Sequence, residues 1–317
     1  MVDRPKKPSC LTTTTSPITQ ELVSVSHSNS RVSATLATGE SIDILLFGAT
    51  IISWRDKNGQ ELLWLSESAN LNGQKAVRGG LPLVFPIFGK DSTHASTSQL
   101  PQHGFARISY WDFLGKSSSE SDGDDSVKLD FGLSPANLTE ENKKNWPYTF
   151  GLIYSVTLSK NGLTTSLVVR NGGEKSWDFQ ALLHTYFRVK DISTVEITGL
   201  ESSPYLDKTS TPNSSGTSSS EPQKITSKID QIFTPASSSD TPILIHHDGN
   251  KKFQIIRDNF NEVVVWNPWK EDAASLSDFE PCEGYKNMVC VEVGVINGWI
   301  ELGPGETWEG SQIISVQ

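Results

Sequence analysis

The sequence predicts an all-β protein built from antiparallel sheets, arranged as a sandwich or a barrel. Three observations support this prediction. Short runs rich in β-branched and aromatic residues recur along the chain. Turn signals such as Asn161-Gly162, Asn171-Gly172-Gly173 and Asn297-Gly298 separate these runs and are typical of hairpins. Helical periodicity is scarce, and strands without interleaved helices argue against a parallel sheet.

The first twenty residues are rich in Pro, Ser and Thr, which predicts a disordered arm over 1–20 followed by a single β domain over 21–317. Asn161-Gly162 stands between two runs that alternate between apolar and polar residues, so this dipeptide gives the clearest hairpin prediction. The strands expected in the domain are Ser41–Phe47, Thr50–Trp54, Val127–Leu133, Gly151–Leu158, Leu163–Val169, Trp177–Val189, Phe253–Arg257, Glu262–Trp266, Met288–Ile296 and Thr307–Val316.

Three further segments complete the expected organisation. A short helix is predicted at Leu138–Asn145, because Pro135 precedes it and Pro147 ends it. The acidic tract Ser117–Ser126 and the Ser/Thr-rich tract Thr209–Ser220 are expected to be surface loops, since neither can bury enough apolar area to become ordered.

Charge and cysteine content limit the partners. With 27 basic and 37 acidic residues the formal net charge is −10, which argues against nucleic acid or an anionic membrane as a partner. A small phosphorylated ligand needs only a few local cations and stays possible. Because the three cysteines are an odd number and form no CxxC pair, we expect neither a disulfide framework nor a metal site. The N-terminal residues do not resemble a secretory signal, and no stretch is apolar enough to span a bilayer, so a cytoplasmic protein is expected.

Strand alternation singles out two side chains that can transfer protons. In Phe179–Val189 the odd positions form a core face, and His184 projects from the opposite, more polar face. In Val289–Ile296 every odd position is Val, and Glu292 faces away from that row between two small residues, which are expected to leave open space above it. A His and a Glu on such faces suit general acid–base catalysis, although both are also common as ordinary surface residues.

A second concentration of polar groups precedes these strands. Arg78 stands before Gly79-Gly80, where the backbone is expected to turn sharply or approach a ligand closely. The hexapeptide Gln102–Arg107 adds an amide, an imidazole and a second guanidinium. Two converging arginines would clamp an anion, because guanidinium forks match phosphate oxygens; the alternative is that both arginines only support loops. Trp266-Asn267-Pro268-Trp269 is expected to pack in a loop, with a sugar-stacking platform as the alternative.

Six runs appear in an order that resembles a known family. They are RGGLPLVFPIFG (Arg78–Gly89), PQHGFAR (Pro101–Arg107), LLHTYFRV (Leu182–Val189), IDQIF (Ile229–Phe233), VVVWNPW (Val263–Trp269) and VCVEVG (Val289–Gly294). Together they resemble the aldose 1-epimerases, and among these the glucose-6-phosphate 1-epimerases, or hexose-6-phosphate mutarotases. The resemblance covers roughly residues 23 to 316 and implies a large antiparallel β-supersandwich similar to galactose mutarotase.

The resemblance also implies the reaction and its residues. The α and β anomers of a hexose 6-phosphate would interconvert by ring opening and closure, with His184 as the general acid and Glu292 as the general base on opposite sides of the sugar. A nearby carboxylate or the bound phosphate is expected to raise the pKa of His184 so that it can act as the acid. The substrate-binding positions implied by the family are Arg78, Gln102, His103, Arg107 and Asp230. Asp207 is the alternative to Asp230, because the Ser/Thr-rich tract makes that alignment less secure.

Other expectations and alternatives remain open at this stage. We expect no cofactor, no metal, no nucleic-acid or membrane partner, and a monomer. A protein of the same fold that binds carbohydrate without catalysis would use His184 and Glu292 only as hydroxyl ligands. A glycosidase would instead pair Asp230 with Glu292, at a carboxyl separation of roughly 5–9.5 Å, and would leave His184 without a role.

Overall fold

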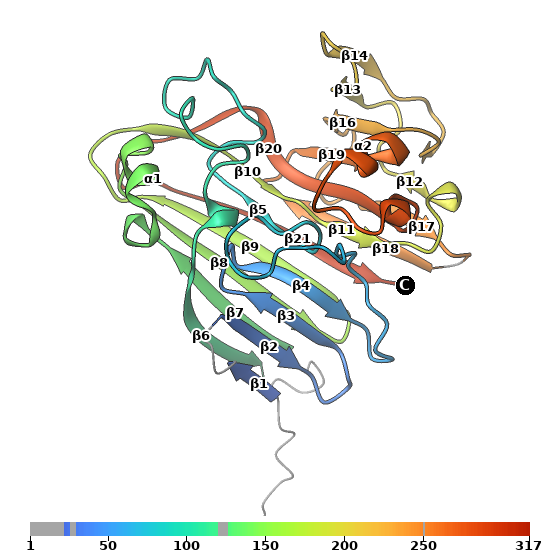
Figure 1. Cartoon of the computed structure of the whole chain (residues 1–317), viewed down its shortest axis with the longest axis horizontal. Coiled ribbons are helices and arrows are strands. Elements are labelled where there is room, and N and C mark those ends of the chain that lie inside the picture. Colours follow the sequence, from blue (N-terminus) through green and yellow to red (C-terminus); the bar gives the residue numbers. More distant parts are fainter. Residues whose placement is uncertain (1–21, 26–29, 120–125, 250) are drawn as a thin grey trace, which may run out of the picture.

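The computed structural model describes residues 22–25, 30–119, 126–249 and 251–317, so the arm predicted for 1–20 lies outside the described residues. Within these ranges the chain forms three antiparallel sheets of four, eight and nine strands (Figure 1). The helices are short. This confirms the predicted all-β class and the antiparallel pairing. Among the described residues, no helix has the length and apolar character needed to cross a membrane.

The elements have the following bounds. The four-stranded sheet has the order β1 (Leu22–Val25), β2 (Arg31–Thr35), β3 (Ser41–Leu45), β4 (Thr50–Arg55). The eight-stranded sheet has the order β14 (Ser214–Thr217), β13 (Pro204–Asp207), β16 (Ile229–Phe233), β19 (Glu262–Asn267), β20 (Met288–Leu302), β10 (Trp177–Leu183), β5 (Leu83–Val84), and β11 (Tyr186–Arg188) also pairs with β20. The nine-stranded sheet has the order β15 (Gln223–Lys224), β12 (Glu196–Thr198), β17 (Ile243–His247), β18 (Lys251–Asp258), β21 (Thr307–Val316), β9 (Gly162–Asn171), β8 (Phe150–Ser159), β7 (Ser126–Leu133), β6 (Asp112–Ser119). The helices are α1 (Glu140–Asn145) and α2 (Trp269–Ser275), with 3-10 turns at Ala106–Ile108, Pro135–Asn137, Ile192–Thr194 and Cys282–Asn287.

One continuous hydrophobic core contains side chains from all three sheets. In β9 the core positions Leu163, Leu167 and Val169 are fully buried and alternate with half-exposed residues, as strand geometry requires. Each of the ten predicted runs overlaps an observed strand. Among the strands that were not predicted, β13 and β14 have only four residues each and β14 is polar, whereas β2 and β17 were missed although they alternate between buried and half-exposed residues.

The predicted hairpin at Asn161-Gly162 is confirmed with a shift of one residue. Ser159 pairs with Gly162, so Lys160 and Asn161 form the turn and Gly162 opens β9. Gly162 has a φ of +153°, and a Cβ atom there would lie only 2.0 Å from the carbonyl oxygen of Ile314 on β21. The glycine is therefore required by the neighbouring strand and not by the turn itself.

Three predictions on helices and loops need correction. The predicted helix starts two residues later than expected, because Thr139 caps α1 by accepting from the amide of Asn142. Trp269, which was expected to pack in a loop, instead begins helix α2. The tract Thr209–Ser220 contains β14, which gains order by pairing with β13.

The acidic tract 117–126 is also partly a strand. Its first three residues lie in β6 and its last residue opens β7, whereas 120–125 lie outside the described residues. The turn predicted at Asn297-Gly298 is instead a bulge inside β20, where the register with β10 shifts. The side-chain amide of Gln180 donates to the carbonyl oxygens of Ile296 and Gly298, so the irregular backbone is hydrogen-bonded.

Candidate active site

Strand β20 crosses the middle of the eight-stranded sheet between β19 and β10 (Figure 1). Its odd residues from Val289 to Val295 belong to the main core, which confirms the predicted core face. Glu292 lies on the opposite face and is only 1% exposed. The open space expected beside Gly294 is absent, because a Cβ atom there would lie 2.9 Å from Cβ of Leu182. The room that Gly294 provides is thus filled by β10.

His184 lies beside β20 because the predicted strand over Trp177–Val189 is interrupted. The amides of His184 and Tyr186 donate to the carbonyl oxygens of Pro82 and Gly80, and β10 ends at Leu183. Gly80 is needed there, since a Cβ atom on it would lie 2.2 Å from the carbonyl oxygen of Ile51. The close approach expected at this glycine is therefore made to the backbone at Ile51, a residue of β4.

His184 and Glu292 are in direct contact. Their Nδ1 and Oε1 atoms are 3.3 Å apart, and His184 is 8% exposed. Neither Nδ1 of His184 nor Oε2 of Glu292 has a hydrogen-bond partner. The imidazole stacks on the Tyr186 ring at 4.6 Å with an interplanar angle of 7°, and the Trp266 ring meets it edge-on at 6.2 Å. The two groups therefore stand side by side on one sheet face, which corrects the expectation that they flank a ligand from opposite sides.

Strand pairing shows which of the two candidate aspartates, Asp230 or Asp207, lies on the sheet face of the His–Glu pair. Asp230 on β16 pairs with Trp266, which pairs with Cys290 on β20, so Asp230 belongs to the same sheet face as Glu292. Asp207 points elsewhere: its carboxylate accepts from the Gln231 amide and from the Thr209 hydroxyl. The structure thus brings Asp230, and not Asp207, to the face that carries the His–Glu pair.

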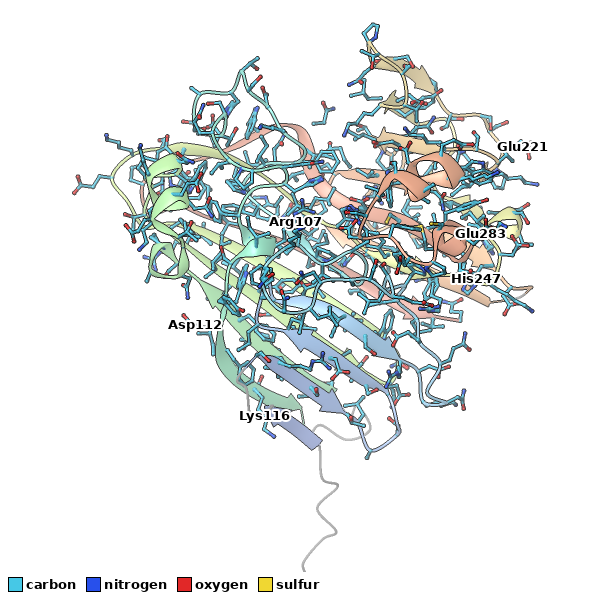
Figure 2. All side chains as sticks on the ribbon, in the orientation of Figure 1. Arg107, Asp112, Lys116, Glu221, His247 and Glu283 are labelled. Carbon is cyan, nitrogen blue, oxygen red and sulfur yellow. The ribbon has the colours of Figure 1, made fainter. Side chains whose placement is uncertain are left out.

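Two loop arginines reach this face from sequence-distant motifs. The amide of Phe105 donates to the carbonyl oxygen of Phe85, and this bond ties the two motifs together. Arg78 donates from Nε to Asp278 at 3.2 Å and from Nη1 to the Tyr186 hydroxyl at 3.3 Å. Arg107 lies near the middle of the molecule (Figure 2).

The environments of the two guanidinium groups differ. Arg107 donates from Nη2 to the Gln102 carbonyl oxygen, but its Nε is buried without a partner. Burial, together with the charge of Arg78, lowers the pKa of Arg107 to about 10. The pKa of Arg78 is instead raised by Tyr186 and Asp278. Of these two arginines, Arg78 forms an ion pair with Asp278, and Arg107 forms none within the described part of the chain.

The remaining two predicted positions lie at the edge of this cluster. His103 adopts a left-handed backbone with a φ of +64°, and its Nδ1 accepts from the amide of Gly89. Its ring lies 6.1 Å from that of His184, and burial followed by the charge of Arg107 lowers its pKa. Gln102 is exposed, and only its carbonyl oxygen bonds within the cluster, to Arg107.

Burial favours the neutral forms of the His–Glu pair. The pKa of Glu292 is raised, mainly by burial and then by the charge of Asp230. The pKa of His184 is lowered, mainly by burial and then by Arg107 and Arg78. The nearby carboxylate therefore does not raise the pKa of the unliganded His184 as the sequence analysis expected. Burial thus favours a protonated Glu292 carboxyl group over the carboxylate, and a neutral His184 imidazole over the imidazolium.

Sequence comparison identifies the family. A model of the family described as aldose 1-epimerase matches residues 31–315. The chain belongs to the aldose 1-epimerase family. A protein from Cenchrus ciliaris named "Putative glucose-6-phosphate 1-epimerase" is 35% identical over 278 residues, which cover 86% of this chain and 80% of that protein. A protein from Escherichia coli K12 with the same name is 31% identical over 247 residues, covering 78% of this chain and 77% of that protein.

Solved structures agree with this aldose 1-epimerase assignment. The crystal structure of a "putative mutarotase" from Salmonella typhimurium has a TM-score of 0.76 at 26% identity, and covers 91% of each chain. The galactose 1-epimerase of Lactobacillus acidophilus shares the fold, with a TM-score of 0.68 at 15% identity, covering 94% of this chain and 98% of that chain. The galactose mutarotase-like fold implied by the sequence resemblance is confirmed.

Two residues of this candidate site, Lys208 and Tyr186, were not among the sequence candidates, and a third, Trp266, was considered only as the alternative to loop packing. Lys208 follows β13, its amide donates to the Asp230 carbonyl oxygen, and its charge acts on both His184 and Glu292. Tyr186 was visible in the sequence on the same strand face as His184 but lacked an assigned role. Trp266 was assigned mainly to loop packing. The alternation of β19 places it on the face of Glu292, and that pattern was the available signal.

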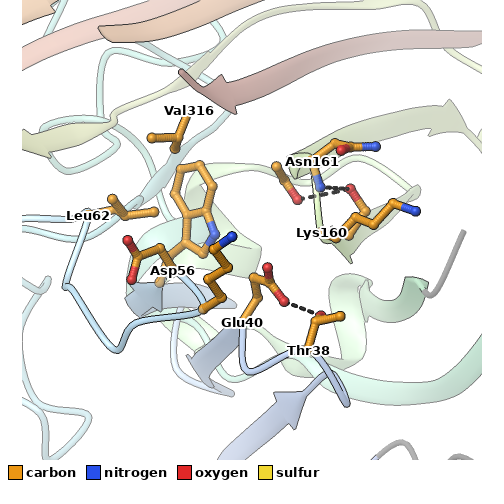
Figure 3. A pocket seen from close by; sticks show the side chains of 11 residues that line it. Thr38, Glu40, Asp56, Leu62, Lys160, Asn161 and Val316 are labelled. Atoms are coloured by element: carbon orange, nitrogen blue, oxygen red, sulfur yellow. Dashed lines mark hydrogen bonds between the residues drawn. The ribbon is translucent and has the colours of Figure 1, made fainter. Parts of the chain in front are cut away.

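One sizeable cavity of the fold lies away from this chemistry. A cavity of about 440 Å³ lies where the β8–β9 turn approaches the end of β4, and its lining includes Glu40, Trp54, Asp56 and Lys160 (Figure 3). None of the seven predicted site residues lines it. The acid–base pair is recognised by its side-chain chemistry, and cavity volume does not identify it.

The raised pKa of Glu292 predicts a pH-dependent stability. Between the ordinary pKa near 4.5 and the raised folded value, the folded state holds a proton that the unfolded state has lost, so stability falls as pH rises. Glu292→Gln removes this ionisation. The unfolding free energy of this variant relative to that of the parent should therefore increase as the pH rises from 5 to 8. Urea unfolding at pH 5 and at pH 8 measures the difference in unfolding free energy between the variant and the parent. The same difference at both pH values would mean that the carboxyl group titrates normally.

Proposed function

We propose that this epimerase-family protein interconverts the α and β anomers of hexose 6-phosphates, with glucose 6-phosphate as the first substrate to test. The observation that carries the proposal is that three cations, Arg78, Arg107 and Lys208, act electrostatically on one buried His–Glu pair in a chain with a net charge of −10. The names of the curated relatives support the same substrate class.

In this proposal the sugar phosphate is bound mainly by Arg107. Its Nε is buried without a partner, and a guanidinium with a pKa of about 10 gains much from an anion. Arg78 contributes less, because Asp278 already neutralises part of its charge. Lys208, whose Nζ lies 4.7 Å above the Phe88 ring, supplies a third positive charge. These groups account for a phosphate site in an otherwise acidic protein.

The side-by-side pair suits ring opening. Anomer exchange requires a proton to leave the C1 hydroxyl and another to reach the ring oxygen O5, and both oxygens are bonded to C1. Two groups 3.3 Å apart can therefore serve both oxygens from one side of the sugar. After ring opening, rotation about the C1–C2 bond exposes the other face of the aldehyde, and closure reverses both transfers.

The phosphate also prepares the acid. In the free protein burial favours a protonated Glu292 carboxyl group, whereas the family resemblance implies a carboxylate base and an imidazolium acid. Arg107 and Arg78 are among the causes that hold the pKa of His184 down. A phosphate dianion bound to these arginines cancels their effect, and the proton can then move from Glu292 to His184. Substrate binding and acid formation are thereby coupled.

The other predicted residues hold the sugar. Asp230 shares the sheet face of the pair, and burial raises its pKa, so bonds from sugar hydroxyls would stabilise its charged form. His103, whose Nδ1 accepts from the amide of Gly89, is assigned to substrate binding through its other ring nitrogen. Gln102 lies at the exposed rim, where it would contact the substrate only at its outer end.

Magnetisation-exchange NMR on the two anomers of glucose 6-phosphate tests the function. The exchange rate should rise in proportion to protein concentration, and heat-denatured protein should have no effect. A protein that binds the sugar phosphate and leaves the exchange rate unchanged would be a carbohydrate-binding protein, and the proposed activity would then be wrong.

A further inference from the structure

We propose that Cys290 completes, with His184 and Glu292, a binding site for a thiophilic divalent cation such as Zn²⁺, and that an ion bound there stops the acid–base chemistry. A ring nitrogen of His184, Sγ of Cys290 and a carboxylate oxygen of Glu292 all lie within 4.8 Å of one another, and all three residues are buried. Cys290 has no part in the chemistry described above.

The backbone explains why the three ligand atoms converge. Cys290 and Glu292 are two residues apart on β20, so both project from the same sheet face. His184 reaches that face from the interruption between β10 and β11. Tyr186, two residues further along the chain, pairs directly with Cys290. Tetrahedral zinc spaces its ligand atoms about 3.3–3.8 Å apart. The His184–Glu292 separation of 3.3 Å already meets this, and small side-chain rotations would bring the sulfur into range.

Two of the three ligand groups have unsatisfied lone pairs. Nδ1 of His184 and Oε2 of Glu292 are buried without a hydrogen-bond partner, and such groups cost free energy until something binds them. One nitrogen, one sulfur and one oxygen form a donor set suited to Zn²⁺, whereas Mg²⁺ and Ca²⁺ prefer oxygen alone. Three protein ligands leave the fourth position open to solvent or substrate.

Charge determines which cations the site accepts. The guanidinium groups of Arg78 and Arg107 and the ammonium of Lys208 oppose a bare dication. A dication bound to one thiolate and one carboxylate is neutral in sum, so the opposition disappears once the thiol and the Glu292 carboxyl group have both given their protons to solvent. Only ions that bind thiolate strongly therefore fit.

The inhibitory part of this inference rests on the proposed function, but the binding does not. Binding is tested with Co²⁺ on a Cys10→Ser/Cys282→Ser background, which leaves Cys290 as the sole thiol of the chain. We expect a thiolate-to-cobalt charge-transfer band in the near ultraviolet, displaced by Zn²⁺. Adding Cys290→Ser or, as a second variant, Cys290→Ala should abolish the band while the melting temperature confirms folding. No band, or a band that survives these changes, would overturn the site.

Inhibition is tested on glucose 6-phosphate exchange. Zn²⁺ should inhibit the parent and the matched Cys282→Ser control equally, and a chelator should restore activity. In Cys290→Ser, basal exchange should be retained while the inhibiting Zn²⁺ concentration rises by more than the ~10–100-fold that loss of an outer-shell partner costs. Equal inhibition of both cysteine variants would overturn the inhibitory role. If the parent catalyses no exchange, the proposed function fails while the cobalt measurement still decides the site.

Discussion

Replacing either member of the proton-transfer pair should reduce anomer exchange of glucose 6-phosphate by at least ~10²-fold, the low end for loss of a general acid or base. Glu292→Gln keeps the size of the side chain but cannot accept the C1 hydroxyl proton. His184→Ala removes the group that protonates O5. Because both residues are buried and in contact, solvent cannot easily replace either one. Magnetisation-exchange NMR at saturating substrate measures the loss.

Two controls separate catalysis from folding and binding. His94→Ala removes a histidine that is not part of the candidate site and whose ring stacks on Trp299 at 3.5 Å. This variant should retain exchange. Calorimetry with glucose 6-phosphate should show that Glu292→Gln still binds the substrate. If both pair variants exchange anomers at nearly the parent rate, the acid–base assignment is wrong.

The second large effect concerns the phosphate. Arg107→Ala should weaken glucose 6-phosphate binding by ~1.5–3 kcal/mol, the scale of a hydrogen bond to a charged group. This corresponds to a roughly 10- to 150-fold higher Kd. Arg78→Ala should fall at the lower end of that range, because Asp278 shares its charge in the free protein. Calorimetry on the parent and the two variants measures the order of the losses.

Free glucose is the matched control for this prediction. It has no phosphate to lose, so its weak binding or slow exchange should change little in either arginine variant. Added salt should weaken the phosphosugar more than glucose, although a half-buried guanidinium is screened less than an exposed one. An equal loss of binding for glucose 6-phosphate and for glucose would mean that the arginines only support their loops.

The sequence predicted the pair because its signal is local. Glu292 stands opposite an unbroken row of valines, and His184 stands opposite a core face, so alternation alone separates them from the core. Their contact depends on pairing between β20 and the two strands on either side of His184. Only the family resemblance brought the two residues together before the structure did.

The features that were missed depend on distant backbone contacts. The interruption at His184 exists because Pro82 and Gly80, a hundred residues earlier, offer carbonyl oxygens to its segment. Lys208 lies at the start of a polar tract without periodicity, and it joins the site through pairing of β13 with β16. Neither arrangement leaves a pattern in the local sequence, so neither was available to reasoning from periodicity.

The ratio of catalysed exchange rates for glucose 6-phosphate and glucose tests the central claim most directly. Both sugars should be measured with the same protein sample, at equal concentrations and in a buffer free of phosphate, since inorganic phosphate would compete for Arg107. We expect rapid exchange of glucose 6-phosphate and an exchange of glucose at least ~10-fold slower, the lower bound for loss of a charged hydrogen bond. Equal rates for the two sugars would contradict it.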